Sequence, residues 1–144
     1  MHAYVIFEAG GVRYAAPVEQ IREVLPWVTP TPLPGAPEGV LGVIKARGLT
    51  LPVLTVPERS GTGAPARGDD VRRRLLLAEV GGRQVAIAAD TVVTVARVEP
   101  TASDAVPGPG SGITALVEVG DRPTLTVDLD TLMAPASGDL APSV

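Results

Sequence analysis

The feature that most constrains the fold of this chain is the regular alternation of short β-favouring runs with glycine and proline. Runs rich in valine, isoleucine, leucine and threonine recur throughout, and turn-forming residues separate them. The 16 glycines and 15 prolines make up about a fifth of the 144 residues, which disfavours long helices. The pattern predicts an all-β protein, either a sandwich or a barrel, with little helix. The expected strands are 4–7, 13–16, 21–24, 41–44, 51–56, 74–80, 84–88, 92–98, 113–119 and 124–129.

A glycine-centred motif lies between several of these runs and suggests an internal repeat. The motif occurs as Glu8-Ala-Gly10-Gly11, as Glu79-Val-Gly81-Gly82 and as Glu118-Val-Gly120-Asp121. Two-residue turns of this composition permit the positive φ angles that tight β-hairpins need. Two interpretations stay open at this point. Glycine hairpins look alike in any all-β protein, or the chain contains two similar small barrels within one domain.

Composition argues against several classes of protein. Cysteine is absent and His2 is the single histidine, so thiol chemistry, cysteine metal sites and a positioned catalytic imidazole are not expected. The net charge of −4 is opposite in sign to the surface of a typical nucleic-acid-binding protein. No uninterrupted apolar run reaches the length that a membrane span requires. We therefore expect a soluble, cytoplasmic protein that binds no nucleic acid, does not insert into the membrane, and needs no metal or cofactor held by cysteine or histidine.

The glycine-rich motif, the paired aspartates and the arginine run each have a structural explanation. Residues 108–112 (GPGSG) lack the spacing of a dinucleotide-binding glycine motif and predict a flexible linker. Asp128 and Asp130 are explained by a strand end and by the N-cap of a short C-terminal turn that starts at Asp130. Residues 72–74 (RRR) follow two acidic residues and are expected to form a solvated face.

Residues 26–37 carry five prolines and Trp27, the lone tryptophan. Each proline fixes its own φ angle and disfavours helix before it, so the segment is predicted to be extended and stiff. We expect a rigid connector across the surface, with docking into an aromatic groove of a partner as the alternative. Trp27 is suited to anchor either the core or an interface. Long exposed loops are expected at 57–70 and 100–112, and a flexible tail at 135–144.

A charged turn lies between two apolar runs at residues 45–48. Lys45 is the only lysine in the chain, and Arg47 precedes Gly48. A tight turn at this glycine would present the guanidinium outward. A guanidinium placed in this way offers several coplanar donors to a carboxylate or a backbone of a partner. The alternative is an ordinary hairpin with solvated charges.

The sequence around this turn resembles the CheW family of bacterial chemotaxis adaptors. The family pattern has an alanine–proline pair, a glycine–valine step, an arginine–glycine turn and a proline–valine pair, which this chain offers in register at 36–37, 42–43, 47–48 and 52–53. The resemblance extends over most of the chain in the correct order. Its further elements are Ile21, Glu23 and Val24 after the opening hairpin, Ala89-Asp90-Thr91-Val92 after the later hairpin, and the closing strand at 124–133.

This resemblance implies a CheW-like domain over residues 1–134, built from two small SH3-like five-stranded β-barrels packed together. It also implies a non-enzymatic adaptor that couples chemoreceptors, the methyl-accepting chemotaxis proteins, to a CheA-type histidine kinase. The implied partners are the regulatory domain of that kinase and the cytoplasmic tip of the receptor, which the family accepts in a hydrophobic groove between the barrels. The implied partner-binding residues are Arg47, Gly48, Lys45, Ile21 and Glu23.

Some positions depart from the family pattern, and a second function stays open. Lys45 stands where the family usually has asparagine, Ala46 where it has leucine, and residues 55–56 (TV) where it has Asp-Leu. Lysine cannot hydrogen-bond across a tight turn as asparagine does, so we expect a differently set turn and a different choice of partner. The alternative function is a ligand-sensing β-domain that binds a small metabolite in the cleft between the barrels, with Asp90 or Arg47 supplying polar contacts.

Overall fold

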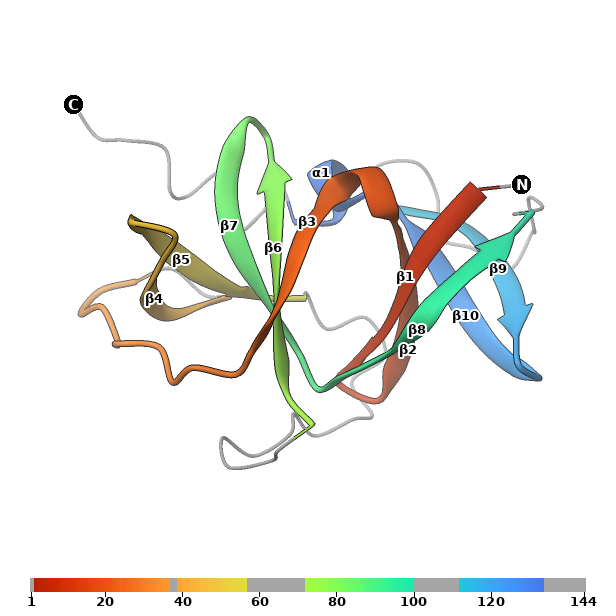
Figure 1. Cartoon of the computed structure of the whole chain (residues 1–144), viewed down its shortest axis with the longest axis horizontal. Coiled ribbons are helices and arrows are strands. Elements are labelled where there is room, and N and C mark those ends of the chain that lie inside the picture. The colour runs from red at the N-terminus through yellow and green to blue at the C-terminus, as the bar shows by residue number, and fades with distance from the viewer. Residues whose placement is uncertain (1, 37–38, 57–71, 100–111, 134–144) are drawn as a thin grey trace.

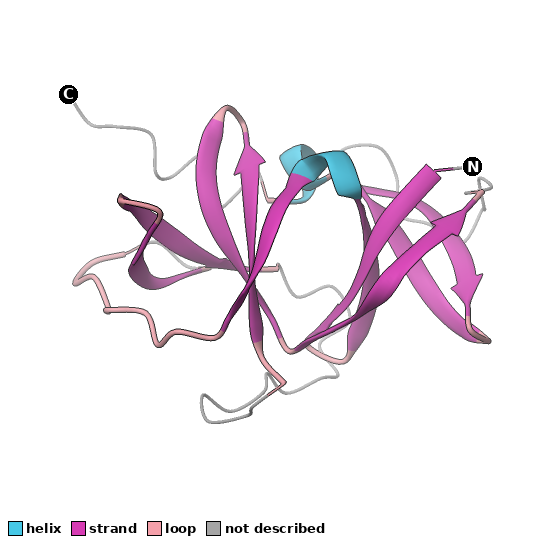
Figure 2. Ribbon diagram, in the orientation of Figure 1, coloured by secondary structure: helices cyan, strands magenta, loops and turns pink. Residues whose placement is uncertain are grey.

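The computed structural model describes residues 2–36, 39–56, 72–99 and 112–133, which form ten strands and two short helices (Figures 1 and 2). The first part of the chain contains β1 (His2–Ala9), β2 (Val12–Pro17), the 3-10 helix η1 (Val18–Gln20), β3 (Ile21–Pro26), β4 (Val40–Ala46) and β5 (Leu49–Thr55). The second part contains β6 (Arg74–Val80), β7 (Arg83–Ala89), β8 (Thr91–Val98), β9 (Ile113–Val119), β10 (Arg122–Val127) and α1 (Leu129–Leu132).

The strands form two five-stranded sheets with the same topology. The first sheet has the order β8-β1-β2-β10-β9 and the second the order β3-β6-β7-β5-β4. In both sheets the third and fourth strands are parallel and all other neighbours are antiparallel. The second sheet uses one continuous stretch of chain, whereas the first takes β1 and β2 from the N-terminal end and β8, β9 and β10 from the C-terminal end. The internal repeat is therefore real, and one of its copies is split.

The hairpins explain why the glycine motif recurs. β1–β2 and β6–β7 are equivalent hairpins in the two sheets, and each turns through two glycines with φ between 58° and 81°. The β9–β10 hairpin turns at Gly120 (φ 58°) and Asp121 (φ 63°). Positive φ at both central residues is the geometry that lets a two-residue turn match the twist of its strands. The strand predictions are confirmed at all ten positions, with ends that differ by a few residues.

Two predictions for the C-terminal part are wrong. The helix begins at Leu129, so Asp130 lies in its first turn and Asp128 occupies the N-cap position, without a side-chain capping bond. The last glycine of the 108–112 motif is no linker residue, because Gly112 is buried and its carbonyl accepts a hydrogen bond from the Asp128 N–H at 2.8 Å. The predicted loop at 57–70, residues 100–111 of the second loop and the predicted tail lie outside the described residues.

Pairing among the described strands does not close either sheet into a barrel. The edge strands β3 and β4 of one sheet, and β8 and β9 of the other, are not hydrogen-bonded to each other. In the second sheet, however, the segment after β3 returns to the opposite edge, where Thr31 and Val43 exchange backbone hydrogen bonds of 2.8 and 2.9 Å. The predicted connector is thus attached to the edge of β4.

The two sheets share one apolar core, which makes the described chain a single packed unit. Phe7 and Tyr14, paired across the β1–β2 hairpin, stack with ring centroids 5.5 Å apart in this core. Alternate residues of the second sheet's central hairpin, such as Leu76 and Ile87, pack against them. The intervening residues face the other way into a smaller cluster that includes Ile44 and Leu51. The central hairpin of that sheet is therefore buried on both faces.

Two aspartates fasten the hairpins of one sheet to the chain of the other. Asp90, which follows β7, accepts a hydrogen bond from the Gly10 N–H in the β1–β2 turn at 3.0 Å. Asp130 in α1, which follows β10, accepts one from the Gly81 N–H in the β6–β7 turn at 3.0 Å. The two contacts are reciprocal, so they hold both hairpins in place relative to the shared core.

Asp128 joins η1 to α1 through a small polar network. The Gln20 amide donates to Asp128 Oδ1 at 2.7 Å and Thr131 donates to its Oδ2 at 2.9 Å, while the Leu129 N–H donates to Gln20 Oε1 at 2.9 Å. The hydrogen bond from Gln20 is the largest cause of a pKa of Asp128 below its ordinary value of 3.8, since it favours the ionised carboxylate.

Substituting Gly112 with alanine should destabilise the protein more than the same change at Gly10. Gly112 has φ +87° and an added Cβ would lie 2.5 Å from the Leu132 backbone, whereas Gly10 has φ +60° and open space around it. Left-handed backbone costs a residue with a Cβ roughly 1–2 kcal/mol, and overpacking adds about 1–3 kcal/mol at Gly112 alone. Urea denaturation of both variants measures the difference. Equal losses would show that Gly112 is not packed against α1.

Asp128→Asn should remove part of the acid sensitivity of the fold. Because its pKa is lowered in the folded state, Asp128 stabilises the fold above its ordinary value of 3.8, and this stabilisation is lost as pH falls through the folded value. The variant should lose about 1 kcal/mol near neutral pH and converge with the wild type in acid. Urea denaturation from pH 7 to 2 tests this. Asp121→Asn, at an exposed turn that asparagine suits, is the control and should show no convergence.

Candidate functional site

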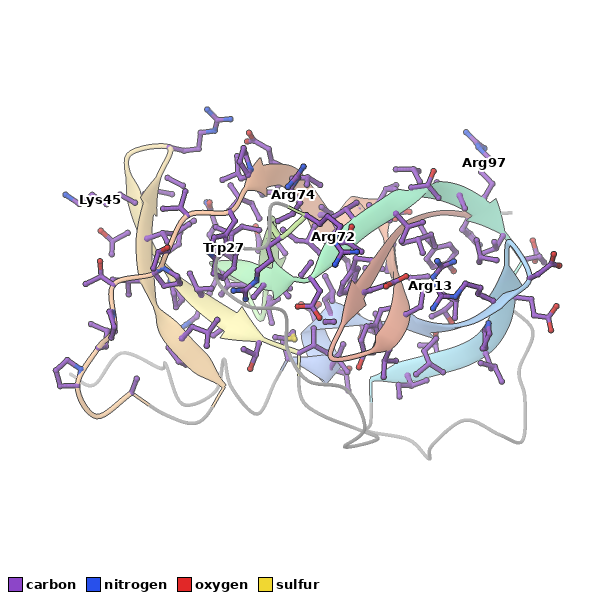
Figure 3. The ribbon with its side chains drawn as sticks, turned by 90° about the horizontal axis from the view of Figure 1, so that it is seen from below. Arg13, Trp27, Lys45, Arg72, Arg74 and Arg97 are labelled. Atoms are coloured by element: carbon purple, nitrogen blue, oxygen red, sulfur yellow. The ribbon has the colours of Figure 1, made fainter. Side chains whose placement is uncertain are left out.

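Four of the five predicted partner-binding residues lie at one corner of the second sheet. Lys45 is the penultimate residue of β4, Arg47 and Gly48 form the β4–β5 turn, and Glu23 lies on the edge strand β3. Lys45, Arg47 and Gly48 are exposed, and Figure 3 shows Lys45 extending away from the sheet. Because β3 and β4 are opposite edges of the sheet, the site brings together two segments that no strand pairing joins. We call Glu23, Lys45, Arg47 and Gly48 the hairpin-tip site.

Ile21 differs from the other four predicted residues. It lies on β3, as expected, but its side chain is half-buried and packs against the shared core. The register of β3 against β6 shifts between Ile21 and Glu23, so the two residues do not follow simple alternation along the strand. The structure therefore does not bring Ile21 into the hairpin-tip site.

The backbone of Arg47 is in the left-handed region, with φ 53°. Arg47 and Asp121 are the non-glycine residues with positive φ among those described. Aspartate adopts this conformation several-fold more often than most residues, whereas arginine has no such preference. The β1–β2, β6–β7 and β9–β10 hairpins all have glycine at the position that Arg47 occupies. Arginine at this turn is thus a local conformational cost that glycine would avoid.

The Arg47 guanidinium pairs with Glu23 in a bidentate manner. Arg47 Nε donates to Glu23 Oε1 at 3.0 Å, and a terminal nitrogen donates to Oε2 of the same carboxylate. The hydrogen bond to Glu23 is the main cause of a raised pKa of Arg47, so the cation is favoured further. The side chains remain 66% and 34% exposed, and an ion pair this open contributes little to stability. The sequence predicts a guanidinium that points outward. In the structure this group is exposed to solvent and is also paired with a carboxylate of the same chain.

Apolar side chains are exposed on the edge strands β3, β4 and β8 and at the start of β5, a feature that the sequence analysis did not single out. Val24 on β3, Leu41 on β4 and Leu49 on β5 are 40 to 43% exposed. On β8, the edge strand equivalent to β3 in the other sheet, Val93 and Val95 are 42% and 60% exposed. The register of β1 against β8 shifts at Val93, because Ile6 pairs with Thr94 and Phe7 with Val92, so the two valines do not follow simple alternation. Exposed apolar residues on unpaired edges are typical of surfaces that another protein covers.

The arginine run was expected to be a solvated face, and this is wrong for Arg73. Its side chain is buried, with only 8% of the residue exposed, and its guanidinium carbon lies 3.5 Å from the centroid of the Trp27 ring. Trp27 itself packs against the smaller cluster of the second sheet, so it anchors the core. Arg72 is exposed and Arg74 half-buried (Figure 3).

No residues in the described ranges form a group of three or more side chains suited to hold a metal ion. Asp128 and Asp130, the paired carboxylates of the sequence, are engaged with Gln20, Thr131 and the Gly81 N–H. The longest helix in the same ranges has four residues, too short to cross a membrane.

Fold and site together define a class of all-β proteins in which two topologically equivalent five-stranded sheets share one core and expose a charged hairpin tip. The sequence matches the family model for the CheW-like domain over residues 3–136. The chain belongs to this family.

Individual relatives agree with this assignment. The chain is 29% identical over 133 residues to the chemotaxis protein CheW of Rhizobium meliloti (strain 1021), covering 89% of this chain and 84% of that protein. It is 35% identical over 109 residues to protein FrzA of Myxococcus xanthus, covering 76% and 66%. The crystal structure of the scaffolding protein TtCheW from Thermoanaerobacter tengcongensis has the same fold, with a TM-score of 0.76, 23% identity and 92% coverage of both chains.

Arg47→Gly should leave the protein more stable than Arg47→Ala. Both variants lose the pair with Glu23 and the long side chain, but only alanine keeps a Cβ in left-handed backbone. Against the wild type, Arg47→Gly should melt at the same temperature or a few degrees higher, because the lost surface pair is worth little. Thermal melts of the three proteins measure this. A lower melting temperature for glycine than for alanine would contradict the left-handed turn.

Proposed function

We propose that this chain is a non-enzymatic, cytoplasmic adaptor that couples chemoreceptors to a CheA-type histidine kinase. Membership of the CheW-like family and the names of its relatives, chemotaxis proteins and a scaffolding protein, support this role. In this proposal each five-stranded sheet corresponds to one SH3-like unit of the adaptor. Its partners are the regulatory domain of the kinase and the cytoplasmic tip of a methyl-accepting chemotaxis protein, and it requires no cofactor.

The observation that carries the proposal is the strained, exposed arginine at the β4–β5 turn. Glycine at this position would relieve the backbone, and an exposed ion pair does not offset the strain by itself. Residues held in unfavourable backbone conformations, with no gain to stability, cluster at functional sites. We therefore assign Arg47, with Gly48, Glu23 and Lys45, to the binding of the kinase regulatory domain. Ile21 supports β3 from the core side in this assignment.

The exposed valines of the edge strands support a second contact surface. Val93 and Val95 on β8, with Val24 on β3, offer apolar area without a covering element among the described residues. An amphipathic helix binds such a surface through its apolar face. The receptor tip, a helical hairpin in the family, is the occupant that we propose here.

The alternative, a metabolite-binding domain, has less support. It relied on Asp90 or Arg47 to hold the ligand. Asp90 accepts a hydrogen bond from the Gly10 N–H, and Arg47 is paired with Glu23. Both groups are therefore already engaged within the chain.

Arg47→Glu should abolish binding to the kinase regulatory domain while the fold survives. The change places two carboxylates together at the hairpin tip and removes the planar donor group. Calorimetric titration of the purified chain with the regulatory domain from the same organism measures the affinity. We expect at least a hundredfold loss. Arg122→Glu is the matched control, because Arg122 is also exposed (58%) and paired with a glutamate, Glu8, at 3.2 Å. Equal losses in both variants would contradict the assignment.

A charge swap separates direct contact from an effect within the chain. The double variant Glu23→Arg with Arg47→Glu restores an ion pair of reversed polarity. If Arg47 contacts the partner, the double variant should have the melting temperature of the wild type but still fail to bind the regulatory domain. Recovery of binding would show instead that only the internal pair matters and that Arg47 does not touch the kinase.

A further inference from the structure

Trp27 and Arg73 form a stacked pair just beyond the end of the β3–β6 ladder. Pro26 pairs with Arg74 in the antiparallel register of these strands, so Trp27 and Arg73 are the next residues opposite each other. The guanidinium carbon of Arg73 lies over the indole ring, 3.5 Å from the ring centroid. Arg73 is buried to more than nine-tenths, while Trp27 is half-buried. The pair therefore lies just beneath the surface of the second sheet.

The stacked pair leaves two hydrogen-bond donors unsatisfied. Arg73 Nε and Trp27 Nε1 are both buried and have no hydrogen-bond partner within the described residues. Stacking satisfies the face of the guanidinium, but its N–H groups lie in its plane and point away from the ring. Native proteins rarely leave buried donors without an acceptor, and a buried cation without a counter-ion is more costly still. Both missing interactions are ones that an anionic acceptor would supply.

The neighbouring arginines do not share this deficit. Arg74 donates to the Arg73 carbonyl at 2.8 Å and has a further interaction, and Arg72 also has a partner. Within the described residues, the Arg73 guanidinium is therefore a buried cation with no acceptor at Nε. A single carboxylate matches it in charge, and its two oxygens match two in-plane donors, whereas a phosphate would bring a second, uncompensated charge.

We propose that Trp27 and Arg73 form a carboxylate-binding site. The half-buried indole gives the ligand a side of approach, and binding requires the two side chains to shift so that their buried donors face the ligand. The carboxylate comes either from a free small acid or from an acidic side chain of a partner protein. The site does not depend on the hairpin-tip site or on the proposed adaptor function.

The lone tryptophan makes this site directly measurable. Because Trp27 is the only tryptophan in the chain, tryptophan emission reports on this pair alone. Two probes are titrated into the full chain at constant ionic strength: sodium acetate replacing sodium chloride, and pentaglutamate compared with pentaglutamine. We expect a saturable change in emission. Saturation by acetate identifies a free carboxylate as sufficient, and saturation by pentaglutamate alone identifies an acidic segment of a protein.

Variants of adjacent arginines decide whether Arg73 binds the ligand. Arg73→Met should abolish the saturable response, while Arg74→Met, which removes the same charge one residue away, should retain it. Arg73→Met should melt at or above the wild-type temperature, because a buried unpaired cation is replaced by an apolar side chain of similar size. If Arg73→Met does not fold, Arg73→Lys should weaken the response at least tenfold, since it lacks the planar donors. No saturation by either probe, or an unchanged response in the folded Arg73 variant, would falsify the proposal.

Discussion

The shared core between the two sheets is the constraint on which the rest of the structure depends. Phe7 and Tyr14 from one sheet and Leu76 and Ile87 from the other are all fully or almost fully buried there. Neither sheet can bury these faces alone, because each is only five strands wide and its edges do not pair. Burial of side chains of this size contributes about 1.5–3 kcal/mol each, far more than the aspartate contacts that fasten the hairpin turns. Those contacts set geometry, and the core supplies stability.

The hairpin-tip site depends on this arrangement through the second sheet. The β4–β5 turn of this sheet lies close enough to β3 for Arg47 to reach Glu23 on the opposite edge strand. Thr31 and Val43 join the segment after β3 to the β4 edge through backbone hydrogen bonds. The ion pair is exposed and adds little energy, so the position of the guanidinium follows from the sheet rather than from the pair. A rigid scaffold thus holds a charged group at a surface that contributes little to folding.

Local chemistry made much of the fold predictable. The strands and the tight turns at Gly10, Gly81 and Gly120 follow from β-favouring residues and from the need for positive φ, which are short-range effects. Non-local contacts were not predictable. The split repeat arises from the parallel pairing of β2 with β10, and the burial of Arg73 arises from its register opposite Trp27. Likewise, the resemblance suggested the hairpin tip, but no pattern along the chain indicates that Glu23 is the counter-ion of Arg47.

The split repeat also determines the order in which the molecule can assemble as it leaves the ribosome. The sheet of β3 to β7 is complete once residue 89 has been made. The β1–β2 hairpin precedes this sheet in the chain, but it has neither strand neighbour until β8 and β10 follow, so its two edges remain unpaired while the second sheet forms. Contacts that join distant parts of a chain form slowly. The residues of β1 and β2 are thus synthesised before β3 to β7 but paired after them, and this hairpin is the part of the nascent chain most in need of protection from aggregation.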